Sequence, residues 1–166
     1  MNCVAHMKIS EYVIRPDLPV PLDVVEKIYL YHAMPMNIVR EYLGRPIYVS
    51  KNSGFRHEQH EIEKGRTDLM SEHLFRPLDR PGSERGFGAS DYRATLKMMP
   101  YLAKLIIECT QYSRITFYPS VATPFFHCDY RFGFDTTRTY IAKKSWIQVP
   151  QMEFIEHISI NAQKKQ

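Results

Sequence analysis

A histidine and an aspartate two positions apart are the first residues of this chain whose types and spacing suggest chemistry. His127 and Asp129 lie in the run FFHCDY, residues 125–130, whose aromatic content is typical of a β-strand. Side chains alternate between the two faces of a strand, so both residues point to one face. Such a pair suits a metal ligand and the carboxylate that orients it. The alternative is a solvated strand face on which both are simply hydrated.

Two further residues carry ligand atoms. His73 lies in the run SEHL, and Asp91 follows the run GAS just before an apolar segment that reads as a helix. Taken alone, Asp91 is best explained as a helix cap. Together with His127 they form a His/Asp/His set, which leaves a fourth zinc position for water, as catalytic zinc sites do. The two imidazoles favour zinc over calcium or magnesium.

The first part of the chain is expected to form short helices and a short strand that help to position the candidate ligands. Residues 1–21 are rich in proline and predict an extended lead-in. Apolar residues at helical spacing predict a helix over 24–33 that Asp23 caps and Pro35 ends. A second helix is expected over 36–43, stopping at Gly44, and a short strand over 46–50. Residues 51–90 are polar and predict a long functional loop.

The second half predicts one long helix followed by strands. The helix spans about 93–111, and Pro100 inside it should kink or split it. Strands are expected over 114–118, 125–130 and 138–142. Residues 151–166 are expected to be a tail whose end frays. The predicted fold class is α+β, with N-terminal helices packed on a small antiparallel sheet that carries the zinc site in a single domain over 22–150.

Composition excludes several classes of protein. No apolar run approaches the roughly 20 residues that span a bilayer, so no membrane protein is expected, and no signal peptide is recognisable. The net charge of +4 suits a polyanion such as DNA or an anionic cell wall. No predicted helix carries a basic stripe, so nucleic-acid binding is not expected. The three cysteines are expected to be reduced thiols.

A series of short motifs runs through the chain in a recognisable order. It consists of SGFR at 53–56, SEH at 71–73, ASD at 89–91 and FHCD at 126–129. The series resembles the hedgehog-type zinc peptidases, which include the D-alanyl-D-alanine carboxypeptidases and the phage L-alanyl-D-glutamate endolysins. The resemblance spans about residues 47–146. It implies a zinc-dependent peptidase that acts on the stem peptides of peptidoglycan, and both kinds of bond are compatible with these motifs.

Carried over by position, the resemblance implies Zn²⁺ on His73, Asp91 and His127. Arg56 would hold a substrate carboxylate or steady the oxyanion, a role that suits a guanidinium fork. The resemblance also implies a phage product that reaches the cell wall or is carried in a virion, with a bacterial cytoplasmic protein as the alternative. It leaves the oligomeric state open.

The chain departs from the family pattern in two places. Residues 74–90 separate the ligands His73 and Asp91, a longer stretch than in S-x-H-x-x-G-x-A-x-D. The general base usually found two or three residues before the last histidine is replaced by Pro124 and Phe125. Asp129 and Glu72 are then the candidate catalytic bases. The alternative is a weak or inactive member that serves as a zinc-containing wall-binding or virion module.

Overall fold

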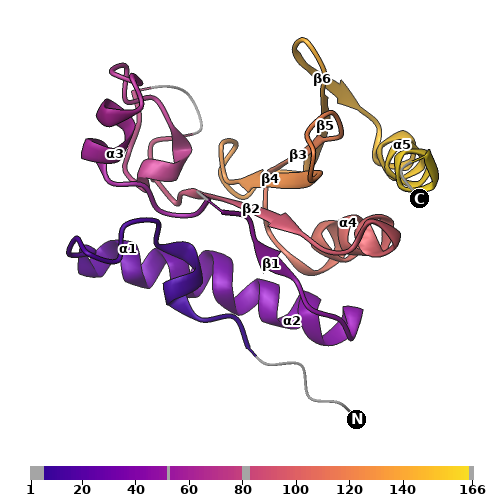
Figure 1. Ribbon diagram of the computed structural model, residues 1–166, viewed down its shortest axis with the longest axis horizontal. Helices are drawn as coiled ribbons and strands as arrows, with labels where there is room; N and C mark the ends of the chain where they lie inside the picture. Colours follow the sequence, from indigo (N-terminus) through magenta and orange to yellow (C-terminus); the bar gives the residue numbers. More distant parts are fainter. Residues whose placement is uncertain (1–5, 52, 80–82, 165–166) are drawn as a thin grey trace.

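The computed structural model describes residues 6–51, 53–79 and 83–164. The described chain is mixed α+β, as expected, with helices and one six-stranded sheet (Figure 1). The expectations that fall on residues 1–5, 52, 80–82 and 165–166 lie outside the described residues. No helix in the described ranges is both long and apolar enough to cross a membrane.

The sheet is mixed rather than purely antiparallel. Its strands lie in the order β1-β2-β4-β3-β5-β6, and of these pairs only β3–β5 is parallel. The strands are β1 (Tyr48–Val49), β2 (Ala89–Arg93), β3 (Arg114–Tyr118), β4 (Phe125–Asp129), β5 (Arg138–Ala142) and β6 (Trp146–Val149). The expected antiparallel sheet is therefore wrong at one position. The chain returns from β4 past β3, along residues 130–137, before β5 begins, and this crossover brings β5 beside β3 in the same direction.

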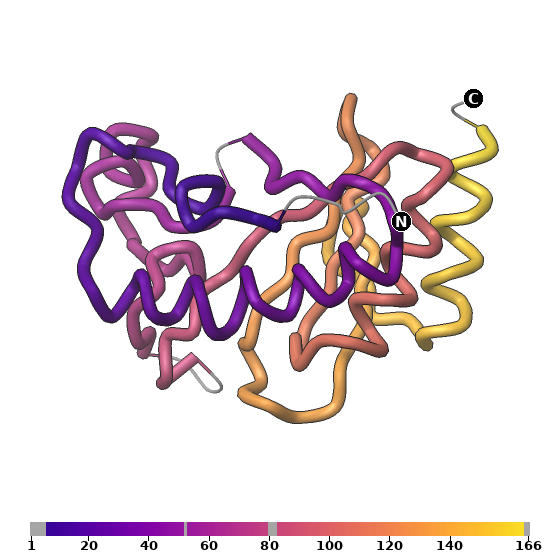
Figure 2. The backbone as a smooth tube through the Cα atoms, turned by 90° about the horizontal axis from the view of Figure 1, so that it is seen from below, coloured from indigo at the N-terminus to yellow at the C-terminus, as the bar shows by residue number. Residues whose placement is uncertain are grey.

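The N-terminal helices form one continuous rod, which Figure 2 shows running along the molecule. It comprises α1 (Leu22–Lys27), the π-helix η2 (Ile28–Ala33) and α2 (Met34–Leu43), and it ends at Gly44 as expected. The expected break at Pro35 is wrong. Proline cannot bond to the carbonyl of Tyr31, and the Tyr130 hydroxyl donates to that carbonyl instead, at 2.6 Å. The π-helix directly before Pro35 accommodates the missing bond.

The helix expected over residues 93–111 is shorter than the sequence pattern suggests. Residues 89–93 form β2, and α4 (Met99–Cys109) begins only after a 3₁₀ turn, η4 (Leu96–Met98). Pro100 thus lies in the first turn of α4, where no partner for its missing N–H is needed. The expected kink is absent because the helix starts later, and Asp91 is a strand residue instead of a helix cap.

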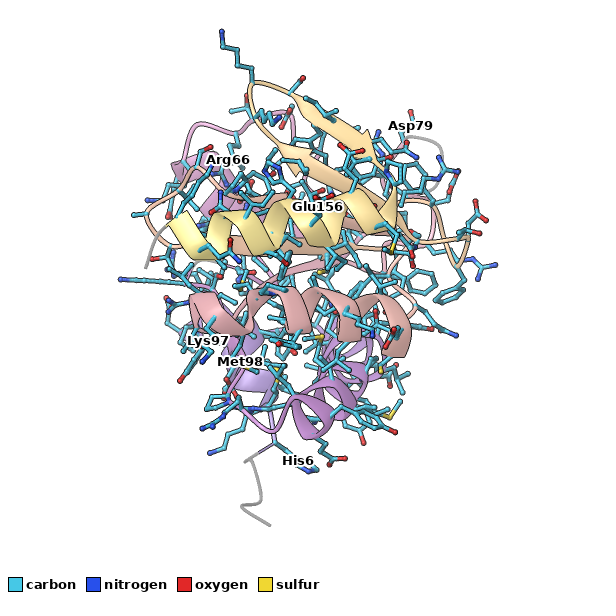
Figure 3. All side chains as sticks on the ribbon, turned by 90° about the vertical axis from the view of Figure 1, so that its right-hand side faces the viewer. His6, Arg66, Asp79, Lys97, Met98 and Glu156 are labelled. Carbon is cyan, nitrogen blue, oxygen red and sulfur yellow. The ribbon has the colours of Figure 1, made fainter. Side chains whose placement is uncertain are left out.

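The C-terminal residues form an ordered helix in place of the expected tail. Helix α5 (Gln151–Lys164) packs beside α4, and Figure 3 shows the two side by side, with Lys97 and Met98 near the start of α4 and Glu156 on α5. Phe154 and Ile158 of α5 are buried in the main hydrophobic cluster. The lead-in also contributes, since Tyr12 of the short η1 (Ile9–Tyr12) is completely buried.

The hydrophobic core lies on one side of the sheet, and the segment that holds α3 (Glu58–Glu63) and the 3₁₀ turn η3 (Glu72–Leu74) lies on the other. Helices α1, α2 and α4 cover one side, whereas this segment rises on the opposite side (Figure 1). Tyr92, Phe126 and Cys128 point toward the helices and are buried. Their strand neighbours, at the alternate positions, therefore face the segment that holds η3.

Candidate metal centre

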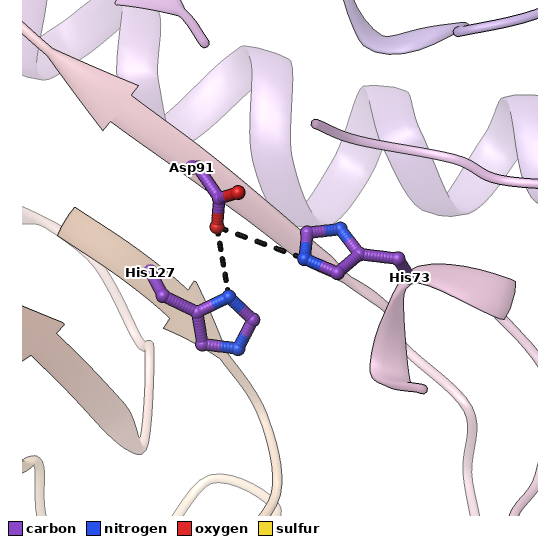
Figure 4. Close-up of side chains that lie close together, drawn as sticks. All are labelled: His73, Asp91 and His127. Atoms are coloured by element: carbon purple, nitrogen blue, oxygen red, sulfur yellow. Dashed lines mark hydrogen bonds and ion pairs between the residues drawn. The ribbon is translucent and has the colours of Figure 1, made fainter. Parts of the chain in front are cut away.

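The structure brings His73, Asp91 and His127 together, as expected from the sequence. Their ligand atoms all lie within 4.8 Å of one another, and all three side chains are buried (Figure 4). His73 Nε2 lies 3.6 Å and His127 Nδ1 lies 2.8 Å from the same oxygen, Oδ1 of Asp91. Within the described part of the chain, this is the one group of histidine, cysteine and acidic side chains arranged to hold a metal ion.

Strand pairing places Asp91 and His127. β2 and β4 are antiparallel neighbours, and Asp91 lies directly opposite His127 in their register. Both residues occupy the face that points away from the helices. Side chains directly opposite on one face are close enough to interact, so a shared ion is a natural consequence of the register.

His73 comes from η3, which lies on the side of the sheet opposite the helices. Ser71 caps this turn by accepting a bond from the His73 amide, and the His73 carbonyl accepts a bond from the Arg56 amide at 2.8 Å. The ring is oriented by its Nδ1–H, which donates to the carbonyl of Gly54 at 2.9 Å. This bond directs the lone pair of Nε2 toward Asp91, which is the arrangement that metal-binding histidines show.

The segment 53–56 supports the centre through its backbone as well as through Arg56. Ser53 accepts a hydrogen bond from the Asp91 amide. Gly54 has φ of +79°, and a Cβ there would lie 2.3 Å from the Tyr12 carbonyl oxygen, so only glycine fits this close approach. Sequence reasoning assigned a role to Arg56 alone. The signal that could have identified Ser53 and Gly54 was their place in the same motif.

Asp129 orients His127 from behind. Its Oδ2 accepts a bond from His127 Nε2 at 2.9 Å and is also bonded to the Arg114 guanidinium, and its Oδ1 accepts the Arg131 amide at 2.9 Å. With Nε2 held in this way, Nδ1 is the nitrogen that faces Asp91. The arrangement matches the carboxylate–histidine pairing that fixes a metal ligand.

The pKa values follow from these partners. Burial disfavours the charged form of His127, but the hydrogen bonds to Asp129 and Asp91 outweigh burial and raise its pKa to about 9. Burial lowers the pKa of His73 to about 3 despite the attraction of Asp91. Although burial favours the neutral acid, His127 and Arg114 hold the pKa of Asp129 well below its usual range. A metal would bind when His127 releases its Nδ1 proton.

A cavity of about 320 Å³ opens in front of the three ligands. Arg56 and Glu72, two of the expected catalytic residues, line it, and the third, Asp129, lies behind His127 and is completely buried. Glu72 accepts a hydrogen bond from the buried Ser83 hydroxyl at 2.5 Å. Ser83 belongs to the stretch 74–90 by which the chain departs from the family pattern. The longer stretch therefore supplies a residue that holds Glu72 beside the ligands.

Side chains that sequence reasoning gave no catalytic role complete the cavity. Tyr118 and Phe125 stack face to face at 4.7 Å, and Trp146 meets Tyr118 edge-on at 6.2 Å. A second recess of about 640 Å³ shares Arg56, Met70 and Ser71 with this cavity. The two hollows therefore adjoin each other at these three residues.

His57 and His60, which lie three residues apart, do not form a second metal site. His57 Nε2 bonds to the Pro19 carbonyl at 3.1 Å, while His60 is buried on α3, and neither joins a ligand group among the described residues.

Comparison with protein-family models, with curated proteins and with solved structures finds no match for this chain.

Proposed function

We propose that this protein is a zinc-dependent peptidase that hydrolyses a peptide bond in peptidoglycan stem peptides. The observation that carries the proposal is the convergence of His73, Asp91 and His127 at the wall of a cavity. Two imidazoles and one carboxylate are the protein ligands of many hydrolytic zinc sites, which keep a position for water. The orienting contacts from Gly54 and Asp129 to the two imidazoles add support, because metal-binding histidines usually have such partners.

The protein residues in this proposal have separate tasks. When bound, zinc would polarise the scissile carbonyl and lower the pKa of its water to about 7. Glu72 accepts a proton from the attacking water, the water oxygen bonds to the carbonyl carbon, and Glu72 returns the proton to the departing amine as the C–N bond breaks. Asp129 is a poor alternative base, because both of its oxygens are engaged and Arg114 and His127 hold its pKa low.

The cavity also suits the substrate class. Arg56 and Arg131 line the cavity, and Arg56 lies where the second recess begins. A stem peptide carries carboxylates, and a guanidinium fork binds a carboxylate through two parallel hydrogen bonds. The second recess offers space for substrate residues on one side of a scissile bond held at the ligands. A D-Ala-D-Ala bond and an L-Ala–D-Glu bond are both consistent with this layout.

The test compares Glu72→Gln with Glu63→Gln, a matched change at another glutamate, on α3. Purified peptidoglycan is incubated with the zinc-loaded proteins, and new amino and carboxyl termini are quantified by mass spectrometry. We expect the Glu72 variant to bind zinc normally and to lose about 10²–10⁴-fold in hydrolysis rate, as expected for loss of a general acid–base. We expect the Glu63 variant to behave as wild type. Wild-type protein that contains no stoichiometric zinc, or whose cleavage survives chelation, would refute the proposal.

A second candidate is a zinc-containing module that binds the wall or serves in a virion without cleaving. It is favoured by Pro124 and Phe125, since neither residue can accept a proton at the positions where the related families place a base. Zinc binding and retention on peptidoglycan, with no released peptide termini at any enzyme concentration, would select this candidate over the peptidase.

A further inference from the structure

Trp146 lies over the candidate metal centre although it comes from a distant strand. It is the first residue of β6, which follows β5 by a tight hairpin in which the Lys143 amide donates to the Ser145 carbonyl. The hairpin rises from the sheet on the side opposite α1 and α2 (Figure 1). Its indole ring lies 5.8 Å from the His127 ring, measured between centroids. The hairpin therefore forms one wall of the cavity.

The indole ring also covers the Arg114 guanidinium. The Arg114 Cζ atom lies 4.4 Å from the Trp146 ring centroid, within the range of a cation–π contact. Arg114 is buried although it carries a permanent charge, whereas Trp146 is 42% exposed. The ring thus separates the guanidinium from solvent while it remains in contact with solvent itself.

Arg114 is connected to His127 through the carboxylate of Asp129. Its Nε donates to Asp129 Oδ2 at 2.8 Å, and its Nη2 donates to the same oxygen. That oxygen also accepts His127 Nε2. The position of the imidazole therefore depends on the position of Asp129, which depends in turn on the guanidinium beneath the indole. Shielding the ion pair from water strengthens it.

We infer that Trp146 and Arg114 are positioning residues for His127, and that the β5–β6 hairpin thereby sets the affinity of the centre for its metal. The inference builds on the metal centre of the proposed function. A guanidinium can donate in its plane while its face stacks on a ring, so Arg114 engages both partners at once. The contacts that orient a metal ligand typically change metal affinity 10–100-fold.

Arg138, on the neighbouring strand, provides a comparison for Arg114. It lies directly opposite Arg114 in the register of β3 and β5. Its guanidinium stacks on Phe132 at 4.1 Å and bonds to the exposed Asp135, away from the ligands. Each arginine therefore has its own ring and carboxylate, but only the Arg114 pair connects to a ligand of the candidate centre.

The experiment compares Trp146→Ala and Trp146→Phe with Ile147→Ala. Ile147 is the next residue on the same strand and is 43% exposed, so it is a matched control for burial. Zinc affinity is measured by competition with a chromophoric chelator, and the Co²⁺-substituted proteins are compared by visible absorption. We expect Trp146→Ala to weaken zinc binding about 10-fold or more and to change the cobalt spectrum. We expect Trp146→Phe to recover most of the affinity and Ile147→Ala to match wild type, with every variant folded as judged by circular dichroism.

A second readout uses the fact that Trp146 is the only tryptophan of the chain. Its fluorescence should be quenched when Co²⁺ binds, because the ring lies against His127. Zinc affinity of Trp146→Ala within twofold of wild type, or an equal loss in Ile147→Ala, would overturn the inference, as would bound Co²⁺ that leaves the fluorescence unchanged. These measurements need no substrate, so a protein that binds zinc but cleaves nothing would refute the peptidase alone. A wild-type chain that binds neither metal would refute both proposals.

Discussion

Two buried histidines, one on each side of the sheet, have pKa values shifted in opposite directions. His32, on the helix side, bonds to the Tyr112 hydroxyl at 2.9 Å and to the Phe87 carbonyl at 3.0 Å, and burial lowers its pKa to about 4. His127, on the cleft side, bonds to two carboxylates, which outweigh burial and raise its pKa to about 9. Burial is similar at both sites, so the partners determine which form each histidine takes.

This difference separates a structural cluster from a chemical one. The His32 cluster contains neutral hydroxyls, with the Tyr92 and Tyr112 oxygens 2.7 Å apart, and its polar groups have partners inside the core. The His127 cluster concentrates two carboxylates around imidazoles, which makes it attractive to a cation. Asp91 and Tyr92 are consecutive residues of β2 that point into the two clusters, so the sheet itself keeps them apart.

The largest expected effect is on zinc affinity, which should depend on His127 but not on His32. His127→Ala removes a ligand, so we expect its zinc affinity to fall more than 100-fold, beyond the loss typical of an orienting partner. His32→Gln changes a histidine outside the ligand group and should bind one zinc per chain. Elemental analysis of the purified variants measures both. Stoichiometric zinc in His127→Ala would contradict the proposed centre.

The next effect concerns stability on the cleft side. Arg114→Met leaves the buried Asp129 without its guanidinium partner, so we expect the free energy of unfolding to fall by about 3–5 kcal/mol. Arg138→Met removes the exposed pair with Asp135 and the stacking on Phe132, and it should cost about 1 kcal/mol. Urea denaturation followed by circular dichroism gives both values. Equal losses in the two variants would show that burial of the ion pair is unimportant.

On the helix side, the expected effect depends on pH. The folded-state pKa of His32 is about 4, against about 6.5 in an unfolded chain, so the unfolded state binds more protons as pH falls below 6.5. His32 should therefore lower the free energy of unfolding by about 2–3 kcal/mol between pH 7 and pH 4.5. The measurement is urea denaturation of the chelator-treated protein at both pH values. His32→Gln should reduce this loss, while a change at the exposed His6 should not, and an unaltered pH dependence in His32→Gln would argue against the assignment.

The smallest expected effect tests the edge of the tyrosine cluster. The Tyr12 hydroxyl makes only long contacts, at 3.4 Å to Tyr92 and 3.5 Å to the Met7 sulfur. Tyr12→Phe should therefore cost less than about 1 kcal/mol of unfolding free energy, because weak hydrogen bonds contribute little net stability. Thermal unfolding detects the change. A loss as large as that in Arg114→Met would mean that the cluster is more tightly coupled than these distances indicate.

Local patterns predicted the strands better than the helices. β3 and β5 match the expected residues, and β4 differs by one, because alternation of side chains over a few residues is a local property. The long helix was predicted to begin at about residue 93, but Arg93 ends β2, and α4 begins only at Met99, after η4. α5 was missed because its burial depends on α4, which lies far away in the sequence, and β6, a short and mostly exposed strand, was missed as well.

The sequence by itself predicted which three residues meet at the candidate centre, through a series of short motifs, and it predicted the common face of His127 and Asp129 from the two-residue period of a strand. Only the tertiary structure decided that Asp91 lies opposite His127, that the Gly54 carbonyl orients His73, and that Trp146 covers Arg114. These contacts join segments that are distant along the chain. They arise from strand register and from a close approach that only glycine permits, which a local pattern of side chains does not encode.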